Sequence, residues 1–414
     1  MNINKSIIAT ILLLSGVCGI VNAQNTNTQS PYSKFGYGLL NDNATSAQRQ
    51  MGGVGYAMSS GRQVNVMNPA SYAGIDSLTF LFDMGVDLTY YDSKDPGGRA
   101  HDFGGGLDYI TMQFPIGKRL GMSLGLLPYS SVGYSFGTKL ENGSSTHEGT
   151  GGLNQLNLGL AGRVFKGFNV GFNVSYLFGT NFNDVYAYGT STSLFEQVLE
   201  VRDWHIQVGA QYTFKFNKRN RLTAGVVYTP GKDLLGHTWI QKYDVDKDVK
   251  VDTLSYTSLK GVRSLPASWG VGLGYGFDDK FFAEVDVTYQ EWSKAKHAEI
   301  DDNFQSGKFC DRYRIGAGLQ YTPNSRGNFI QRVNYRLGGY YNRDYMMVGD
   351  SHVKDYGISC GFGLPAPGAK TVINVGFEYI HRQATAANLL KENYFNVTLG
   401  INFNQLWFYQ NKIR

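Results

Sequence analysis

The sequence predicts an all-β protein, a transmembrane antiparallel β-barrel of about 14 strands with an N-terminal hatch inside its lumen. Apolar residues alternate with small or polar ones from Leu78 to the C-terminus, which is the period of half-buried strands. The chain has 52 glycines and only 17% charged residues, a composition that suits a barrel. Tight turns also alternate with longer polar connections, as they do at the two rims of a barrel.

Residues 1–23 have the features of a signal peptide. Lys5 precedes an apolar run, and Val21-Asn22-Ala23 is a small-residue cleavage site. The run is short for a membrane anchor, because a spanning helix needs about 20 apolar residues. Cys18 does not indicate a lipoprotein, since Val17 occupies the position before it where a small residue is wanted. The sequence therefore predicts secretion.

Residues 24–77 form an N-terminal extension that contains the predicted hatch. The stretch 51–73 is rich in Gly and Ala, fits neither a strand nor a membrane helix, and contains the helix-breaking turn Asn68-Pro69. A compact segment of small residues ahead of a barrel of residues 78–414 has room inside that barrel. The predicted hatch residues are Gly52, Gly53, Gly55, Asn68, Pro69 and Ala70.

The alternation divides the barrel region into its strands. In the stretch 168–178, aromatic and β-branched residues alternate mostly with Asn, Gly and Ser, and the stretches 269–277 and 395–403 repeat the pattern. The predicted strands lie near 78–91, 104–115, 119–139, 153–165, 168–180, 199–216, 221–231, 262–277, 280–292, 311–322, 332–342, 354–364, 371–382 and 393–409.

The connections between these strands alternate between short turns and long polar loops. The long loops are predicted at 92–103, 140–152, 181–198, 232–261, 293–310, 343–353 and 383–392. An even strand number with short turns at one rim predicts a barrel in the outer membrane of a Gram-negative bacterium, with both termini periplasmic. A soluble sandwich is the alternative, but a sandwich predicts neither the difference between the rims nor the signal peptide.

One parity of the strands is polar and is expected to face the lumen. Most of its charged side chains are expected to pair with one another, with Glu284 and Asp286 facing Arg314 across neighbouring strands. A second hypothesis is that Arg163, Arg314 or Arg336 binds a ligand carboxylate, because a guanidinium offers two parallel donors. The lumen-facing residues on this parity are Asp83, Asp87, Arg163, His205, Gln207, Glu284, Asp286, Arg314, Arg336 and Glu378.

The third predicted strand contains Pro128 near its middle. Proline cannot donate to a ladder, so the strand is expected to have a bulge, to end early or to break its pairing there. Cys310 and Cys360 are predicted to be free thiols, since one strand lies between theirs and two strand spacings, about 9.5 Å, exceed disulfide reach.

No motif in the sequence indicates an enzyme, a cofactor or a metal. Asp244-x-Asp246-x-Asp248 lacks the Gly and Glu that a calcium loop requires, because Val249 and Ser255 stand at those positions. No pair of His residues has zinc-site spacing, and no Ser/His/Asp arrangement is present. A net charge of +5 is too weak to indicate nucleic acid as a partner.

The pairing of GGxGxA at 52–57 with Asn68-Pro69-Ala70 resembles the N-terminal hatch of the FadL/TodX family, the outer-membrane transporters of long-chain fatty acids and other hydrophobic compounds. The stretches 265–275 and 286–321 also resemble strands of that family. The resemblance implies a hatch that plugs the barrel beside the ligand. It also implies that a kink in the third strand opens a lateral gate, bordered here by Pro128 to Gly133.

The leading functional prediction is passive uptake of hydrophobic, fatty-acid-like molecules, which are held against the hatch and released through the lumen or laterally into outer-membrane lipid. The alternative is a barrel that transports nothing and serves as a subunit of a larger outer-membrane assembly for protein insertion or secretion. Long polar loops and the basic tail Gln410–Arg414 favour that alternative, whose partners are outer-membrane or periplasmic proteins. An open porin is disfavoured by the hatch.

Overall fold

The computed structural model describes residues 28–140, 143–189, 191–246, 249–260, 263–297, 308–367, 370–386 and 389–406. The predicted signal peptide and the predicted basic tail lie outside these residues.

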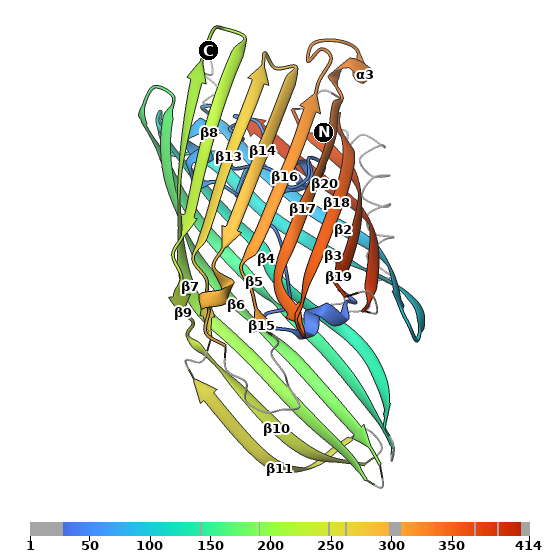
Figure 1. Cartoon of the computed structure of the whole chain (residues 1–414). Helices are drawn as coiled ribbons and strands as arrows, with labels where there is room; N and C mark the ends of the chain where they lie inside the picture. The colour runs from blue at the N-terminus through green and yellow to red at the C-terminus, as the bar shows by residue number, and fades with distance from the viewer. Residues whose placement is uncertain are drawn as a thin grey trace, which may run out of the picture.

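Fourteen antiparallel strands form a closed barrel (Figure 1). Closure is made by β2 and β20, which pair from Thr79 with Leu406 to Lys94 with Lys391. The barrel strands are β2 (Thr79–Asp95), β3 (Gly98–Pro115), β4 (Leu120–Leu140), β5 (Gly143–Phe165), β6 (Phe168–Tyr188), β7 (Thr192–Lys215), β8 (Asn220–Thr229), β13 (Ser268–Phe277), β14 (Phe281–Gln290), β16 (Arg312–Tyr321), β17 (Asn334–Val348), β18 (Ser351–Pro365), β19 (Val372–Ala384) and β20 (Lys391–Leu406).

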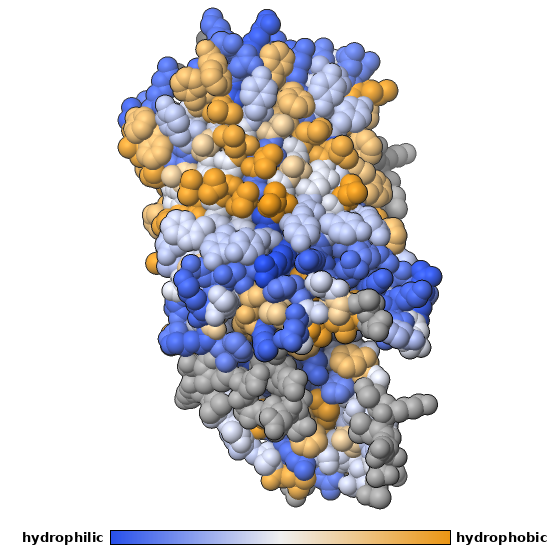
Figure 2. All heavy atoms as spheres, viewed as in Figure 1, coloured by the Kyte–Doolittle hydropathy of each residue, from blue (hydrophilic) through white to orange (hydrophobic). Residues whose placement is uncertain are grey.

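The apolar parity of the strands points outward, as predicted. Leu273 and Ile315 are about half exposed, whereas the inward-facing Asn173 and Asp286 are buried. Figure 2 shows the outward side chains as an apolar band around the upper part of the molecule. A membrane barrel has apolar side chains on the outside and polar ones inside, whereas a soluble sandwich has the reverse.

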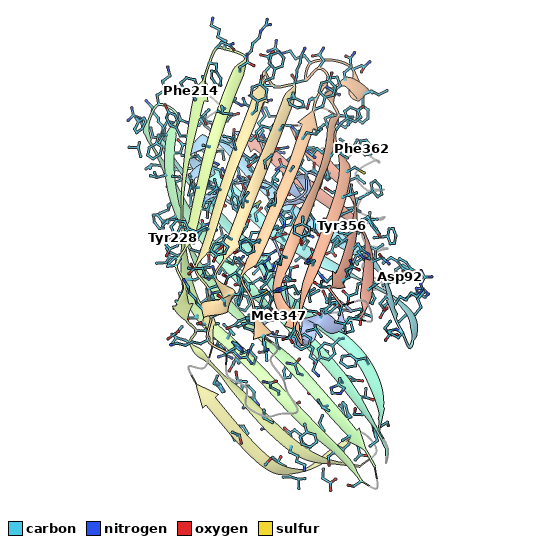
Figure 3. All side chains as sticks on the ribbon, in the orientation of Figure 1. Asp92, Phe214, Tyr228, Met347, Tyr356 and Phe362 are labelled. Carbon is cyan, nitrogen blue, oxygen red and sulfur yellow. The ribbon has the colours of Figure 1, made fainter. Side chains whose placement is uncertain are left out.

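Two aromatic girdles bound this apolar band. At one boundary the rings of Tyr228 and Trp269 pack with centroids 4.1 Å apart, and those of Tyr379 and Phe395 with centroids 5.0 Å apart. The other boundary contains Phe214 and Phe362, and Figure 3 labels residues of both girdles. Aromatic rings at these two levels are typical of the interfaces between a membrane and water.

Five of the predicted long loops are largely continued strand, which corrects those predictions. The ranges 92–103, 140–152, 181–198 and 343–353 belong mainly to hairpins of β2–β3, β4–β5, β6–β7 and β17–β18. The range 232–261 is mainly β10 (Gly236–Asp246) and β11 (Val249–Lys260). β10 adds to the outer half of β7, so the sheet continues beyond the barrel. Their polar sequence predicts loops, because strands outside the membrane need no apolar face toward lipid.

The remaining elements are short. No helix among the described residues is long and apolar enough to cross a membrane. These elements are η1 (Pro31–Lys34), β1 (Leu39–Leu40), α2 (Ser46–Arg49), η2 (Pro69–Gly74), β9 (Lys232–Asp233), β12 (Ser264–Leu265), η3 (Trp292–Lys294), β15 (Lys308–Phe309) and α3 (Phe329–Arg332).

A hydrophobic core, here called the rim core, fills the interior near the rim of the long hairpins. Trp292 is fully buried and stacks on Tyr345 with ring centroids 4.3 Å apart. Tyr37 joins them and donates its hydroxyl to the carbonyl of Ser264 (3.0 Å). The buried members are Tyr32, Tyr37, Leu39, Leu153, Leu177, Leu199, Val201, Leu234, Leu265, Trp292, Ala295, Tyr345, Met346, Val353 and Ala384.

The described residues nearest to the two chain ends lie at opposite rims. Ser30 Oγ donates to Glu392 Oε1 (2.7 Å) near the long hairpins, whereas Leu406 pairs with Thr79 at the short-turn rim. The ends of the mature chain lie outside the described residues, so periplasmic termini stay a prediction. Cys310 and Cys360 are free thiols, as predicted.

Candidate functional site

The candidate site is the N-terminal segment, defined here as residues 28–76, together with the barrel wall that it contacts. On β14, Asp286 Oδ2 accepts hydrogen bonds from the backbone N–H groups of Gly55 (2.7 Å) and Tyr56 (3.0 Å). The neighbouring Glu284 Oε1 accepts from the N–H of Ala57. Two inward carboxylates therefore bind three successive backbone donors of the segment.

These contacts correct the expected pairing of Glu284 and Asp286 with Arg314. In the observed register Asp286 lies opposite Gly316 and Glu284 opposite Gly318, while Arg314 lies opposite Thr288. The inward parity was predicted correctly, but the two acidic residues lie deeper along the strands than Arg314. The backbone of the N-terminal segment takes the place of Arg314 as their partner.

All three arginines predicted to bind a ligand carboxylate contact the N-terminal segment instead. Arg314 Nη2 donates to Gly52 O (2.9 Å), and Arg336 Nη1 donates to Gln50 Oε1 (2.9 Å). Arg163, which is exposed, makes a single contact of 3.1 Å with the carbonyl of Ala73. Recognition of a ligand by these arginines stays a prediction.

Arg314 also binds Asp42 of the segment, with Nε 3.0 Å from Asp42 Oδ2. Arg312 lies on the other side of this carboxylate at 3.2 Å. Burial raises the pKa of Asp42, but the charges of Arg314 and Arg312 outweigh burial, so its pKa lies below the ordinary value of 3.8. Asp42 is therefore an ionised residue held between two cations, with 33% of its side chain exposed.

Inward-facing glycines of the wall make room for the backbone of the segment. A Cβ on Gly338 would lie 2.6 Å from Met51 Cα, and one on Gly272 would lie 2.8 Å from Tyr56 Cβ. Similar close approaches occur at Gly225 and Gly318. Glycine inside a strand marks a place where another backbone comes close, so the alternating glycines of these strands are contact positions.

The predicted hatch residues are all buried in the structure. Gly52 and Gly53 have φ of +71° and +69°, a conformation that favours glycine. Asn68 caps η2 by accepting from Ala70 N (3.0 Å) and donates to Tyr56 O (2.7 Å), with Pro69 at the first helical position. The geometry agrees with a plug, and the role of a hatch remains a proposal.

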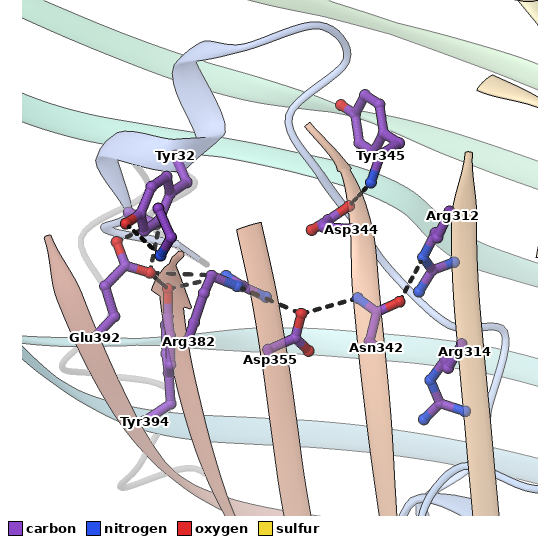
Figure 4. Close-up of polar contacts among 12 residues, drawn as sticks. Tyr32, Arg312, Arg314, Asn342, Asp344, Tyr345, Asp355, Arg382, Glu392 and Tyr394 are labelled. Carbon is purple, nitrogen blue, oxygen red and sulfur yellow. Dashed lines mark hydrogen bonds and ion pairs between the residues drawn. The ribbon is translucent and has the colours of Figure 1, made fainter. Parts of the chain in front are cut away.

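The sequence analysis missed a polar network that joins the segment to six barrel strands, part of which Figure 4 shows. Arg382 lies 3.9 Å from Asp355, Asn342 bridges Asp355 (2.8 Å) and Arg312 (3.0 Å), and Arg312 reaches Asp42. Nearby, Glu392 accepts from Ser30, Tyr91 and Tyr394. All of these wall residues have inward parity, which is the signal that could have found them.

Two small polar cavities lie where the segment, the wall and the rim core meet. The first has a volume of about 160 Å³ and is lined by six acidic side chains and four arginines. The second, of about 110 Å³, shares Asp42, Arg312 and Arg314 with it. The charged residues lining the first are Asp42, Arg49, Asp87, Asp108, Arg312, Arg314, Asp344, Asp355, Glu378 and Arg382. Among the described residues, no group of His, Cys, Asp and Glu could hold a metal ion.

The barrel wall has a seam between β3 and β4 on the side of the long hairpins. Their pairing runs from Pro115 with Gly121 only as far as Ile110 with Leu126. The β4–β5 register shifts between Pro128 and Ser130, so Pro128 lies at a bulge, one of the predicted outcomes. That this seam works as a lateral gate stays a prediction.

The N-terminal segment covers the β4 side of this seam. Leu39 and Leu40 of β1 pair antiparallel with Ser131 and Ser130. The hydroxyl of Ser33 bonds both the N–H and the carbonyl of Gly133, at 3.1 Å each. A strand of this chain has thus been added to the free edge of β4.

Several solved structures have a similar fold, among them a toluene transporter and a monoaromatic hydrocarbon channel. A Pseudomonas aeruginosa FadL homologue superposes with a TM-score of 0.64 at 14% identity, covering 88% of this chain and 99% of that one. The toluene transporter TodX of P. putida gives 0.62 at 13% identity, covering 89% and 100%. The monoaromatic hydrocarbon channel CymD gives 0.58 at 15%, covering 89% and 100%. At such identities the likeness shows a shared fold alone.

No curated protein sequence matches this chain. The BamG family model matches residues 3–414, nearly the whole sequence. The resemblance to FadL/TodX therefore holds for the fold and not for the family. The chain belongs to the BamG family.

Proposed function

We propose that the chain is a barrel of the outer membrane of a Gram-negative bacterium that transports nothing and serves as a subunit of a larger outer-membrane protein assembly. The observation that carries this proposal is a lumen closed at two levels. The N-terminal segment fills the barrel, and the rim core closes the interior near the long hairpins. Membership of the BamG family supports it, because it separates the chain from the hydrocarbon channels whose fold it shares.

The space left inside is unsuited to a hydrophobic ligand. Pockets for small molecules are mostly apolar and measure about 300–1,000 Å³. The larger of the two cavities in the lumen has a volume of about 160 Å³ and is lined by ten charged side chains. A fatty acyl chain placed there would strip water from these charges without replacing their hydrogen bonds, at a large cost in free energy.

The long hairpins offer a surface for protein partners outside the membrane band. The hairpins formed by β5, β6, β7, β10 and β11 extend the sheet well beyond the barrel (Figure 1). Their described residues include exposed Leu254 (54%) and Tyr256 (55%). A channel for small molecules has no need of such a platform, whereas a subunit of an assembly does.

The test is purification in a mild detergent followed by structure determination. The proposal expects partner proteins in fixed stoichiometry and a lumen without lipid-like density. Liposomes that contain the purified barrel should take up a fluorescent fatty acid no faster than liposomes that contain heat-denatured protein. A barrel that purifies alone, with acyl-chain density in the lumen and faster uptake, would refute the proposal.

Passive transport of hydrophobic molecules is the second candidate. One observation favours it, namely the seam between β3 and β4 with a bulge at Pro128, which is where a lateral exit would lie. On this hypothesis the N-terminal segment moves, and Arg314 or Arg336 is released to bind a carboxylate. Locking the segment to the wall by a disulfide would then abolish uptake, whereas the assembly proposal expects no uptake with or without the lock.

A further inference from the structure

The free edge of β3 has no strand beside it among the described residues. β3 pairs with β2 from Gly98 to Gln113, but with β4 only from Ile110 to Pro115. From Gly98 to Tyr109 the backbone groups on the β4 side therefore have no ladder partner, and the N–H of Phe103 donates to Asp102 Oδ1 (2.7 Å). Phe103 and Leu107 are 66% and 49% exposed, whereas Asp108 and Tyr109 are buried.

Part of this edge lies within the membrane band. Phe103 packs on Tyr90 (5.0 Å between centroids), which lies 6.2 Å from Phe395 in the girdle at the long-hairpin boundary. The residues after Phe103 run from this girdle toward the short-turn rim. An unpaired backbone group costs several kcal/mol in lipid, so open sheet edges are avoided there. A free edge at this position therefore needs a partner.

The local sequence allows another backbone to come close. Gly104, Gly105 and Gly106 are consecutive, so no side chain stands on the central part of the edge. Gly105 has φ of +150°, a conformation that favours glycine. Edge strands that are protected from pairing carry proline, lysine or inward charges. The stretch 103–107 has none of these, and the inward charge next to it, Asp108, is bound to Arg49 (2.6 Å).

The opposite side of the same seam already accepts an added strand. β1 pairs antiparallel with Ser130 and Ser131 of β4, which are on the edge that faces β3. An extended segment thus fits the geometry of the seam. The N-terminal segment covers β4 in this way, and no described residue does the same for β3.

We propose that residues 98–109 of β3 are a docking edge that takes an extended strand of a partner protein by β-augmentation at the outer boundary of the membrane. The proposal rests on the proposed function and specifies one of its interfaces. An added strand would satisfy the backbone groups of the edge, and its side chains would pack beside the exposed Phe103 and Leu107. An acyl chain cannot replace this occupant, because lipid tails carry no hydrogen-bonding groups.

The experiment is hydrogen exchange followed by mass spectrometry on peptides covering 98–103, where water reaches the backbone beyond the girdle. The same protein is compared in native outer-membrane vesicles and in phospholipid nanodiscs that hold one copy. Exchange should be about tenfold slower or more in the vesicles than in the nanodiscs. Peptides covering 110–113, which are paired on both sides, serve as the control and should be equally protected in both.

Fast exchange of 98–103 in both preparations would overturn the proposal, and so would slow exchange in both, since the edge would then be covered without a partner. Protection that appears in nanodiscs holding two copies would assign the edge to a second copy of this chain instead. If the protein purifies with stoichiometric partners and 98–103 still exchanges fast, the proposal that β3 is a docking edge is refuted, whereas the proposed role in an assembly is not. A barrel that purifies without partner proteins would refute both the docking edge and the role in an assembly.

Discussion

The replacement Gly338→Ala tests whether the backbone of the N-terminal segment presses against the barrel wall. A Cβ at this position would lie 2.6 Å from Met51 Cα and closer still to Met51 C and Gly52 N. Ordinary contact begins near 3.4 Å, so the segment must move by roughly 0.8 Å or more. The atoms that it meets are backbone, which cannot rotate away. Forcing a group into a packed interior costs about 1–3 kcal/mol.

This cost should fall on the segment and not on the strands. An energy of about 1–3 kcal/mol corresponds to a roughly 5- to 150-fold larger population of the displaced segment. Hydrogen exchange of residues 46–57 should accelerate by that factor, while the barrel still migrates as a folded species on unheated gels. Gly339→Ala is the matched control, because its Cβ would point outward, with the nearest atom the Gly357 carbonyl oxygen at 3.1 Å. Equal exchange in Gly338→Ala and the wild type would refute the reasoning.

Three further predictions concern the contacts of the segment. Arg314→Ala removes the main partner of Asp42, whose side chain is 33% exposed, and a donor to the Gly52 carbonyl. It should cost about 1–3 kcal/mol, measured as chemical unfolding of the segment. Arg163→Ala should change the stability of the segment little. Equal losses of stability in Arg163→Ala and Arg314→Ala would contradict the role of Arg314 as the main partner of Asp42. Leu39 and Ser131 are cross-strand neighbours, so cysteines at both positions should form a disulfide upon oxidation in a variant without Cys310 and Cys360. Absence of this disulfide would contradict the pairing of β1 with β4. The pKa of Asp42 is lowered in the folded protein, so the stability that its charge contributes should be complete above about pH 4 and lost as the pH falls through the folded pKa. Asp42→Asn should abolish this pH dependence of hydrogen exchange in the segment. An unchanged pH dependence in Asp42→Asn would exclude Asp42 as its source.

Much of the barrel was predictable because successive side chains of a strand point to opposite faces, so each residue must suit either lipid or the lumen. In β13 the outward Trp269, Val271, Leu273 and Tyr275 alternate with glycines, so orientation could be read without neighbours. The strand ends beyond the membrane were not predictable in this way. Residues 236–246 and 249–260 lie beyond the membrane band, where polar strands and polar loops have similar compositions.

The sequence by itself determined the outward apolar face, the polar lumen and the presence of a compact small-residue segment ahead of the barrel. These follow from local pattern, because each side chain must suit lipid, water or the interior independently of its distant neighbours. Only the tertiary structure decided which inward groups meet. Arg314 binds Asp42 and Gly52 and not Asp286, because register and the path of residues 28–76 are set by packing between parts of the chain that lie hundreds of residues apart.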